Sequence, residues 1–335
     1  MEAVRGCVWF VSTLRRAAVA AMDHDAFIVA QAAAYSAMVA LFPALILSAA
    51  VVALLPDDLP LRWQLAMFFD RILPSNVSPI LDSYFTIAHK SPRTAGALVS
   101  AFIVSLTGAV SVMATLMEGF RRAHRLPVGR KSFWIRRRRA LELVPLSMLP
   151  FTVASALVVF GHMITQWLAK EMSGSLRLTV YAVAYGLRWA VALAGSTGIL
   201  AVIYHLGTDV STHLSEHLMP QGLSPVNLGP LLRKPMQILR KQWSWRASLP
   251  GAALATGLWF VSTLLFGFYV TRFANYSRVY GSLGAAIALL FWLYLVALCV
   301  LIGAEFNAQV AAQRQQAHSI EVAVDHEKST EAQVE

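Results

Sequence analysis

The chain has 335 residues, of which 57% are hydrophobic and only 14% are charged, and its mean hydropathy is +0.57. A soluble domain carries about 25% charged residues, so this composition excludes an ordinary water-exposed surface. Lys and Arg outnumber Asp and Glu by 28 to 18, an excess that in a membrane protein indicates the positive-inside rule before nucleic-acid binding. The two cysteines, Cys7 and Cys299, form neither a disulfide framework nor a thiolate metal site.

Residues 1–26 form an arm ahead of the first predicted span. Its apolar run, Cys7–Leu14, is followed at once by Arg15 and Arg16, a pattern that argues against a cleaved signal peptide. Two interpretations stay open for this arm: a helix lying along the cytoplasmic membrane interface, or a solvated segment.

Six apolar segments are long enough to be transmembrane helices. The clearest one, residues 281–304, contains no Asp, Glu, Lys, Arg or His, and as a helix it would extend about 36 Å, more than the hydrocarbon thickness of about 30 Å. Nothing alternates with a period of two, so a transmembrane barrel is excluded. We therefore predict an all-α polytopic membrane bundle over residues 27–310, with spans at about 27–55, 94–117, 141–169, 178–204, 248–270 and 281–304.

The segments outside the spans differ in character. Residues 56–93 have apolar side chains at helical spacing, which predicts one or two short amphipathic helices against the outer membrane surface. Residues 205–247 form a long polar connection. The tail, residues 311–335, has no apolar periodicity, and we expect it to be disordered.

The distribution of positive charge predicts the orientation. Nineteen Lys and Arg residues fall on the side that holds both chain ends, against eight on the opposite side. The positive-inside rule then places both termini in the cytoplasm.

Polar residues within the spans are candidate site residues. Arg188 lies about 11 residues inside its span, about 16 Å from either membrane face at helical rise, and an ionisable group at that depth, which costs about 2.5–3.5 kcal/mol to insert, normally faces a cavity or a partner. The guanidinium fork suits phosphate or carboxylate, so we expect Arg188 to bind an anionic headgroup, with a structural pairing as the alternative. Gln31 and Tyr35 share one helix face, which we expect to point into the bundle beside Ser36.

Three further polar residues lie at the ends of spans. Glu305 and Asn307 end the last span, and Glu118 ends the second. The functional interpretation places them in a substrate site, a gate or a proton relay, and the structural alternative is an interfacial salt bridge that fixes a helix end.

The largest basic cluster follows the second span. We expect it to contact anionic lipid, which is worth about 1 kcal/mol per charge near the surface. Only Phe133 and Trp134 are available to stack on bases, so nucleic acid is not an expected partner. The residues expected to contact lipid are Arg121, Arg122, Arg130, Lys131, Arg136, Arg137, Arg138 and Arg139.

One pattern is compatible with a metal site. His205, Asp209, His213 and His217 recur every four residues, and two histidines four apart can ligate a metal on one helix face. Gly207 interrupts that helix, so Asp209, His213 and His217 are weak candidates, and we expect neither a metal nor another cofactor.

Three stretches carry a family resemblance: AAAYSAMVALFPALIL (Ala32–Leu47), the basic turn after Glu118, and the block Leu249–Ala308, which contains YGSLGAAIALLFWLYLVALCVLIGAEFNA. On these stretches the chain resembles the YihY/BrkB family of bacterial inner-membrane proteins, formerly labelled ribonuclease BN-like. The resemblance implies six spans and a location in the bacterial inner membrane. Lipid export has been proposed for the family, and its nuclease label is generally regarded as a misassignment.

The sequence therefore predicts a non-enzymatic membrane protein that transports or flips an anionic lipid or amphiphile, with Arg188 at the headgroup. Membrane lipids are the expected partners, and a homo-oligomer stays open. The alternatives are a scaffolding protein of the envelope and a membrane-bound ribonuclease, which would need metal or acid–base groups.

Overall fold

The computed structural model describes residues 2–53, 92–126, 133–149, 175–208, 245–272 and 283–331. These ranges are helical apart from short turns. Besides a helix over residues 133–149, the elements are α1 (Glu2–Asp23), α2 (Ala26–Ala53), α5 (Pro92–Ala123), α7 (Ser175–Gly207), the 3-10 turn η1 (Trp245–Ser248), α10 (Leu249–Arg272) and α12 (Leu283–Glu331).

Five of these helices are long and apolar enough to cross a membrane. They are α2, α5, α7, α10 and α12, with apolar parts at Ala26–Ser48, Gly96–Ala123, Tyr185–Gly207, Arg246–Arg272 and Gly284–Ala317. They correspond to the first, second, fourth, fifth and sixth predicted spans. The predicted third span, 141–169, is helical up to residue 149 and otherwise lies outside the described residues. The all-helical membrane fold is confirmed, and the count of six stays a prediction.

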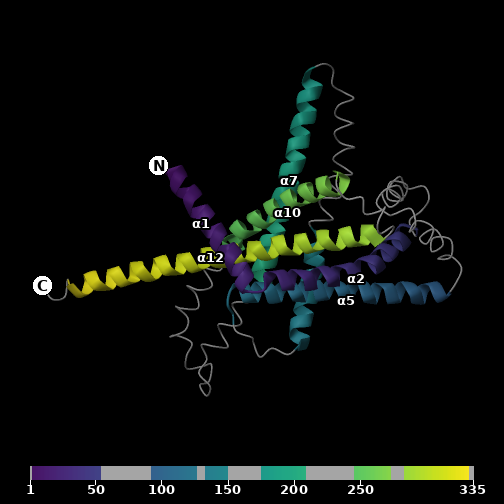
Figure 1. Cartoon of the computed structure of the whole chain (residues 1–335), viewed down its shortest axis with the longest axis horizontal. Helices are drawn as coiled ribbons and strands as arrows, with labels where there is room; N and C mark the ends of the chain where they lie inside the picture. Colours follow the sequence, from purple (N-terminus) through teal and green to yellow (C-terminus); the bar gives the residue numbers. More distant parts are fainter. Residues whose placement is uncertain are drawn as a thin grey trace.

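Figure 1 shows how the long helices are arranged. The axes of α2, α5, α10 and α12 lie roughly parallel or antiparallel to one another, and α7 crosses them steeply. Among the described helices, α2 packs mainly against α5, and α10 packs mainly against α12. Both chain ends extend from the same end of the bundle. The predicted helices of residues 56–93 and most of the 205–247 connection lie outside the described residues.

Small side chains make up much of the core. Ala30, Ala201, Ala252 and Ala255 are fully buried, and small residues let helices in lipid approach closely enough for van der Waals packing. The helices α2 and α5 approach closely at Gly108, where an added Cβ would lie 2.6 Å from the Cβ of Ala40.

Two of the polar residues predicted for the inner face of α2 are exposed within the described part of the chain. Ala33 and Ala34 are buried, whereas Gln31 is exposed and Tyr35 is 68% exposed. Gln31 and Tyr35 thus face away from the described neighbours of α2, which contact its buried alanines and Val29. Most of the predicted third span lies outside the described residues, so their position inside the bundle stays a prediction. Ser36 is half-buried and donates its hydroxyl to the Ala32 carbonyl of its own helix, at 3.0 Å.

The C-terminal tail also differs from its expectation. Residues 311–331 continue α12 as a helix instead of being disordered. Gln, Ala and Arg are good helix formers, and α1 packs along this part: Trp9 donates its indole N–H to Oε1 of Gln313 at 2.7 Å, and Gln313 donates to Thr13 at 3.2 Å. Thus α1 is a helix buried along one side by α12, while its placement at the membrane interface stays a prediction.

Candidate functional site

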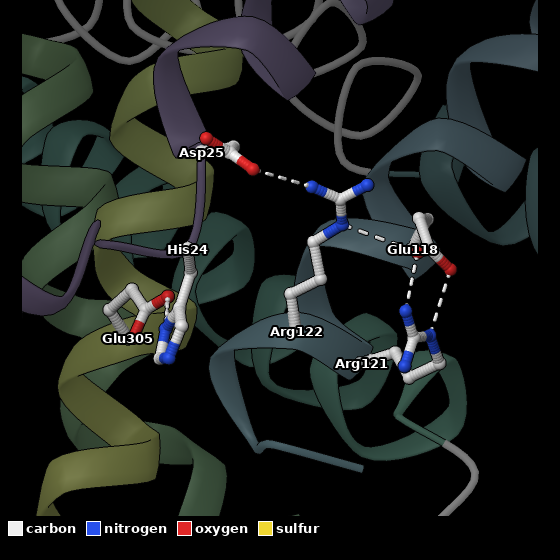
Figure 2. Close-up of polar contacts among 6 residues, drawn as sticks. All are labelled: His24, Asp25, Glu118, Arg121, Arg122 and Glu305. Carbon is white, nitrogen blue, oxygen red and sulfur yellow. Dashed lines mark hydrogen bonds and ion pairs between the residues drawn. The ribbon is translucent and has the colours of Figure 1, made fainter. Parts of the chain in front are cut away.

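A buried carboxylate lies where the α1–α2 turn meets α12. Glu305 of α12 is only 2% exposed, and its Oε1 is 2.8 Å from Nδ1 of His24. The other oxygen, Oε2, is buried and has no hydrogen-bond partner among the described residues. We call Glu305 and His24 the carboxylate–imidazole pair (Figure 2). A carboxylate removed from water with one oxygen unpaired is costly, so such a group is a candidate for function.

The local backbone explains why His24 reaches inward. The N–H of His24 bonds the Ala20 carbonyl at 2.9 Å, and the N–H of Asp25 bonds the Met22 carbonyl at 3.2 Å. Asp25 has a positive φ of 58°, a left-handed conformation in which Asp is enriched. This single residue ends α1 and lets α2 start at Ala26, so the chain changes direction within two residues and His24 lies against α12.

The pair lies near one end of the membrane-spanning part of α12. At 1.5 Å per residue, Glu305 is about 30 Å along the helix from Gly284, which is about one hydrocarbon thickness. Asp23 and Arg125 are close enough to act electrostatically on Glu305. From α7, Tyr204 donates its hydroxyl to the Val300 carbonyl of α12 at 2.6 Å. The carboxylate is therefore shielded by protein but close to the boundary with water.

A set of ion pairs lies beside the carboxylate–imidazole pair. Glu118 accepts hydrogen bonds from Nε and Nη2 of Arg121, at 2.9 and 2.6 Å, and Arg122 bridges Glu118 at 3.3 Å to Asp25 at 3.2 Å. We call Asp25, Glu118, Arg121 and Arg122 the guanidinium cluster (Figure 2). Arg122 thereby ties the end of α5 to the turn that positions His24.

The end of α5 is fixed by a specific turn. Leu126 N–H bonds the Arg121 carbonyl at 3.0 Å, Arg125 N–H bonds the Arg122 carbonyl at 2.9 Å, and Arg125 has a φ of 51°. This is the Schellman pattern, in which one left-handed residue closes a helix. Arg121 also donates Nη1 to the Leu126 carbonyl. The Arg121 guanidinium is thus held by protein groups, whereas Arg122 and Arg125 lie closer to the surface.

Asn307 performs a structural task at the start of α10. Its Oδ1 accepts the N–H of Gly251 at 2.7 Å, and its Nδ2 donates to the Ser248 carbonyl at 2.9 Å. The first N–H groups of a helix have no partner within the helix, so Asn307 caps α10 from the neighbouring helix. Both of its polar groups are used in this way, next to the Gly251–Gly303 contact of α10 and α12.

The remaining basic residues occupy different positions. Arg137 is half-buried and donates Nη2 to Ser111 Oγ at 2.8 Å on α5. Arg136 and Arg138 are exposed, and Arg138 pairs with Glu142 at 3.3 Å. The basic segment therefore both braces α5 and presents positive charge on the surface. Arg139 lies on the same helix, and Arg130 and Lys131 lie outside the described residues.

Other candidates from the sequence cannot be joined to this site. Arg188 lies on α7, as predicted, but its side chain is outside the described residues. Asp209, His213 and His217 are also outside them. Within the described ranges, no group of three His, Cys, Asp or Glu side chains is placed to hold a metal ion.

His24 and Asp25 were not among the site residues predicted from the sequence. A signal was present in the polar pair between two apolar helical segments, because Asp is common in left-handed positions at helix ends. The contact of His24 with Glu305 joins residues 281 positions apart, and no local pattern could reveal it. Chemically, a carboxylate–imidazole pair of this kind can bind and release a proton, and the adjacent arginines can bind an anion.

These helices and the buried charges among them define a multi-pass integral membrane protein. Comparison with known proteins places it more closely, because the family profile described as Virulence factor BrkB matches residues 17–223 and 238–326. The chain belongs to the Virulence factor BrkB family.

Three relatives are informative, and two of them are named membrane proteins. A Bacillus subtilis protein, YfkH, whose name describes it as ribonuclease-like, is 28% identical over 82% of this chain and 86% of its own length. A UPF0761 membrane protein of Rhodospirillum centenum is 25% identical over 91% of this chain, which spans only 58% of that relative. A UPF0761 membrane protein of Tolumonas auensis is 44% identical over 19% of the chain and 21% of the relative. No solved protein structure matches this chain significantly.

Proposed function

We propose that this protein moves an anionic lipid or another anionic amphiphile across the bacterial inner membrane, with both termini in the cytoplasm, and that proton binding at Glu305 is linked to the movement. The single observation that carries the proposal is the carboxylate–imidazole pair. Glu305 is 2% exposed and is bonded to His24 through one oxygen, and its other oxygen has no hydrogen-bond partner among the described residues. Ionisable groups enclosed among membrane helices are typical of transport pathways and proton relays.

The surrounding charges support this proposal. Protonation of Glu305 would remove a negative charge that faces His24 and lies near Arg125. His24 adjoins Asp25 in the α1–α2 turn, and Asp25 is bonded to Arg122. A change in the charge of Glu305 would therefore be felt by the arginines at the same end of the bundle. An anionic headgroup is the ligand that guanidinium groups suit best.

Arg188 remains the predicted headgroup contact within the bilayer. Gln31 and Tyr35 are exposed within the described part of the chain, and their place on the pathway stays a prediction. A ribonuclease activity and a scaffolding role are the competing functions. The ribonuclease would need a metal or acid–base groups acting on RNA, and a scaffold would not respond to a proton gradient.

The test is lipid movement in liposomes. Purified protein is reconstituted with a fluorescent phosphatidylglycerol, and its movement between leaflets is followed by chemical quenching, with and without an imposed pH gradient. We expect protein-dependent movement that a gradient accelerates. In Glu305→Gln, which keeps the shape of the side chain but cannot ionise, we expect the rate to fall about tenfold or more, equivalent to about 1.4 kcal/mol in the barrier, and the gradient to have no effect.

The matched control is Glu142→Gln. Glu142 is also a carboxylate, but it is exposed and pairs with Arg138 on its own helix, so its variant should retain the wild-type rate and pH response. Thermal unfolding in detergent verifies that Glu305→Gln is folded. Wild-type rates and pH response in Glu305→Gln would remove the proton link. Absence of protein-dependent movement by the wild type, with RNA cleavage in its place, would replace the proposed function with the competing one.

A further inference from the structure

An apolar groove lies on the outer surface between α10 and α12. Its volume is about 540 Å³, within the range of about 300–1,000 Å³ typical of ligand pockets. Phe266 and Phe291 form two of its walls, with ring centroids 5.8 Å apart. The complete lining is Ser262, Leu265, Phe266, Tyr269, Ile287, Ala288, Phe291 and Leu295.

The groove opens toward lipid. Both helices that line it are membrane-spanning candidates, and Leu265, Phe291 and Ile287 are 64%, 50% and 39% exposed. Along the helices it extends about 10–12 Å, from near the C-terminal end of α10 toward the middle of the bilayer. An occupant must therefore be thin and apolar, and must enter from the hydrocarbon.

The lining offers little to a polar ligand. The hydroxyl of Ser262 donates to the Trp259 carbonyl at 3.0 Å and is 3.6 Å from Sγ of Cys299. Apart from this hydroxyl and the phenol of Tyr269, the lining side chains are aliphatic or phenyl. Contact between such a surface and a hydrocarbon chain needs no polar partner, and within lipid it is stabilised by van der Waals packing.

A cation stands at one end of the groove. Arg272 is the exposed last residue of α10, two helical turns beyond Leu265 on the same side of the helix and one turn beyond Tyr269. Arginine at this position is complementary to a phosphate or carboxylate headgroup at the membrane boundary. The arrangement of a cation followed by an apolar groove directed into the bilayer matches an anionic amphiphile with an extended tail.

We propose that this groove binds one acyl chain of an anionic membrane lipid, with the headgroup at Arg272. The inference rests on the proposed function, because it specifies the tail site of the amphiphile that the protein would move. It names a phospholipid acyl chain as the occupant, and a helix from a second copy of the chain is the occupant it excludes.

The test uses a phosphatidylglycerol that carries a photoreactive diazirine on one acyl chain, with the full-length protein in phosphatidylcholine liposomes. After irradiation, mass spectrometry locates the labelled peptides. We expect label concentrated on the groove residues of α10 and α12. Ala288→Trp fills the groove and should reduce this labelling roughly tenfold. The control, Leu264→Trp, places the same indole ring at a 60% exposed position outside the groove and should leave the labelling unchanged.

A second arm addresses the headgroup. Arg272→Gln should lower labelling by the phosphatidylglycerol probe several-fold while leaving that by a zwitterionic phosphatidylcholine probe unchanged. Label spread over all lipid-facing helices in proportion to their exposure would overturn the site, and so would cross-links in the groove between two copies of the chain. Groove labelling without protein-dependent lipid movement would leave the site standing and refute the proposed transport. Movement with uniform labelling would do the reverse.

Discussion

The contact of α2 with α5 makes a quantitative prediction about stability. In Gly108→Ala the new Cβ would lie 2.6 Å from the Cβ of Ala40 and 3.0 Å from its Cα. Carbon atoms pack at about 3.5–4.0 Å, so the two helices must separate by about 1 Å. Such overpacking costs about 1–3 kcal/mol, and the better helix propensity of alanine recovers about 0.5–1 kcal/mol. We expect a net loss of about 1–2 kcal/mol.

The design includes a control of opposite sign and a rescue. A Cβ added at Gly195 of α7 meets nothing within 4 Å, so Gly195→Ala should be neutral or stabilising by up to about 1 kcal/mol. Combining Gly108→Ala with Ala40→Gly removes the 2.6 Å contact and should restore more than half of the loss, as a double-mutant cycle would measure. The assay is reversible unfolding in mixed micelles. Equal stability of Gly108→Ala and Gly195→Ala would refute the reasoning.

Two further predictions concern the end of the bundle. Asn307→Ala leaves the Gly251 N–H and the Ser248 carbonyl without their partner, and we expect a loss of about 2–4 kcal/mol in the same unfolding assay; a loss below 0.5 kcal/mol would contradict the cap. Burial lowers the pKa of His124, which lies beyond the end of α5 and bonds the Phe120 carbonyl at 2.9 Å. The unfolded chain then binds the proton more readily, so stability should fall as the pH drops below about 6.5; His124→Asn should reduce this slope, and an unchanged slope would exclude His124 as its source.

The membrane fold could be predicted from the sequence because its signal is local. Runs such as residues 281–304 contain no charge, and in lipid only a helix satisfies their backbone. The orientation of α2 could not be predicted in the same way, because Gln31 and Tyr35 share a face with no indication of which neighbour α2 meets. The contact of α2 with α5 is made by apolar side chains such as Val29 and Ala40, and Gln31 and Tyr35 take no part in it.

The candidate site was predictable only in part. Glu305 and Glu118 were recognised because carboxylates at the ends of apolar segments are conspicuous. Their partners are determined by tertiary structure: His24 comes from a turn at the other end of the chain, whereas Arg121 and Arg122 pair with Glu118 within one helix. From the sequence, all of these arginines were predicted to contact lipid. In the structure, Arg121 instead bonds Glu118 and the Leu126 carbonyl, and it helps to close α5.

The last helix joins the parts of the molecule mechanically. α12 is one unbroken helix of 49 residues, about 73 Å long. Along this one helix, Glu305 contacts His24 of the α1–α2 turn, Asn307 accepts a hydrogen bond from the start of α10, and Gln313 accepts one from Trp9 of α1. A small rotation of the C-terminal part of α12 would displace all three contacts together, since the helix is unbroken between them. A partner bound to residues 311–331 would therefore be connected through one helix to Glu305 and Asn307 inside the bundle.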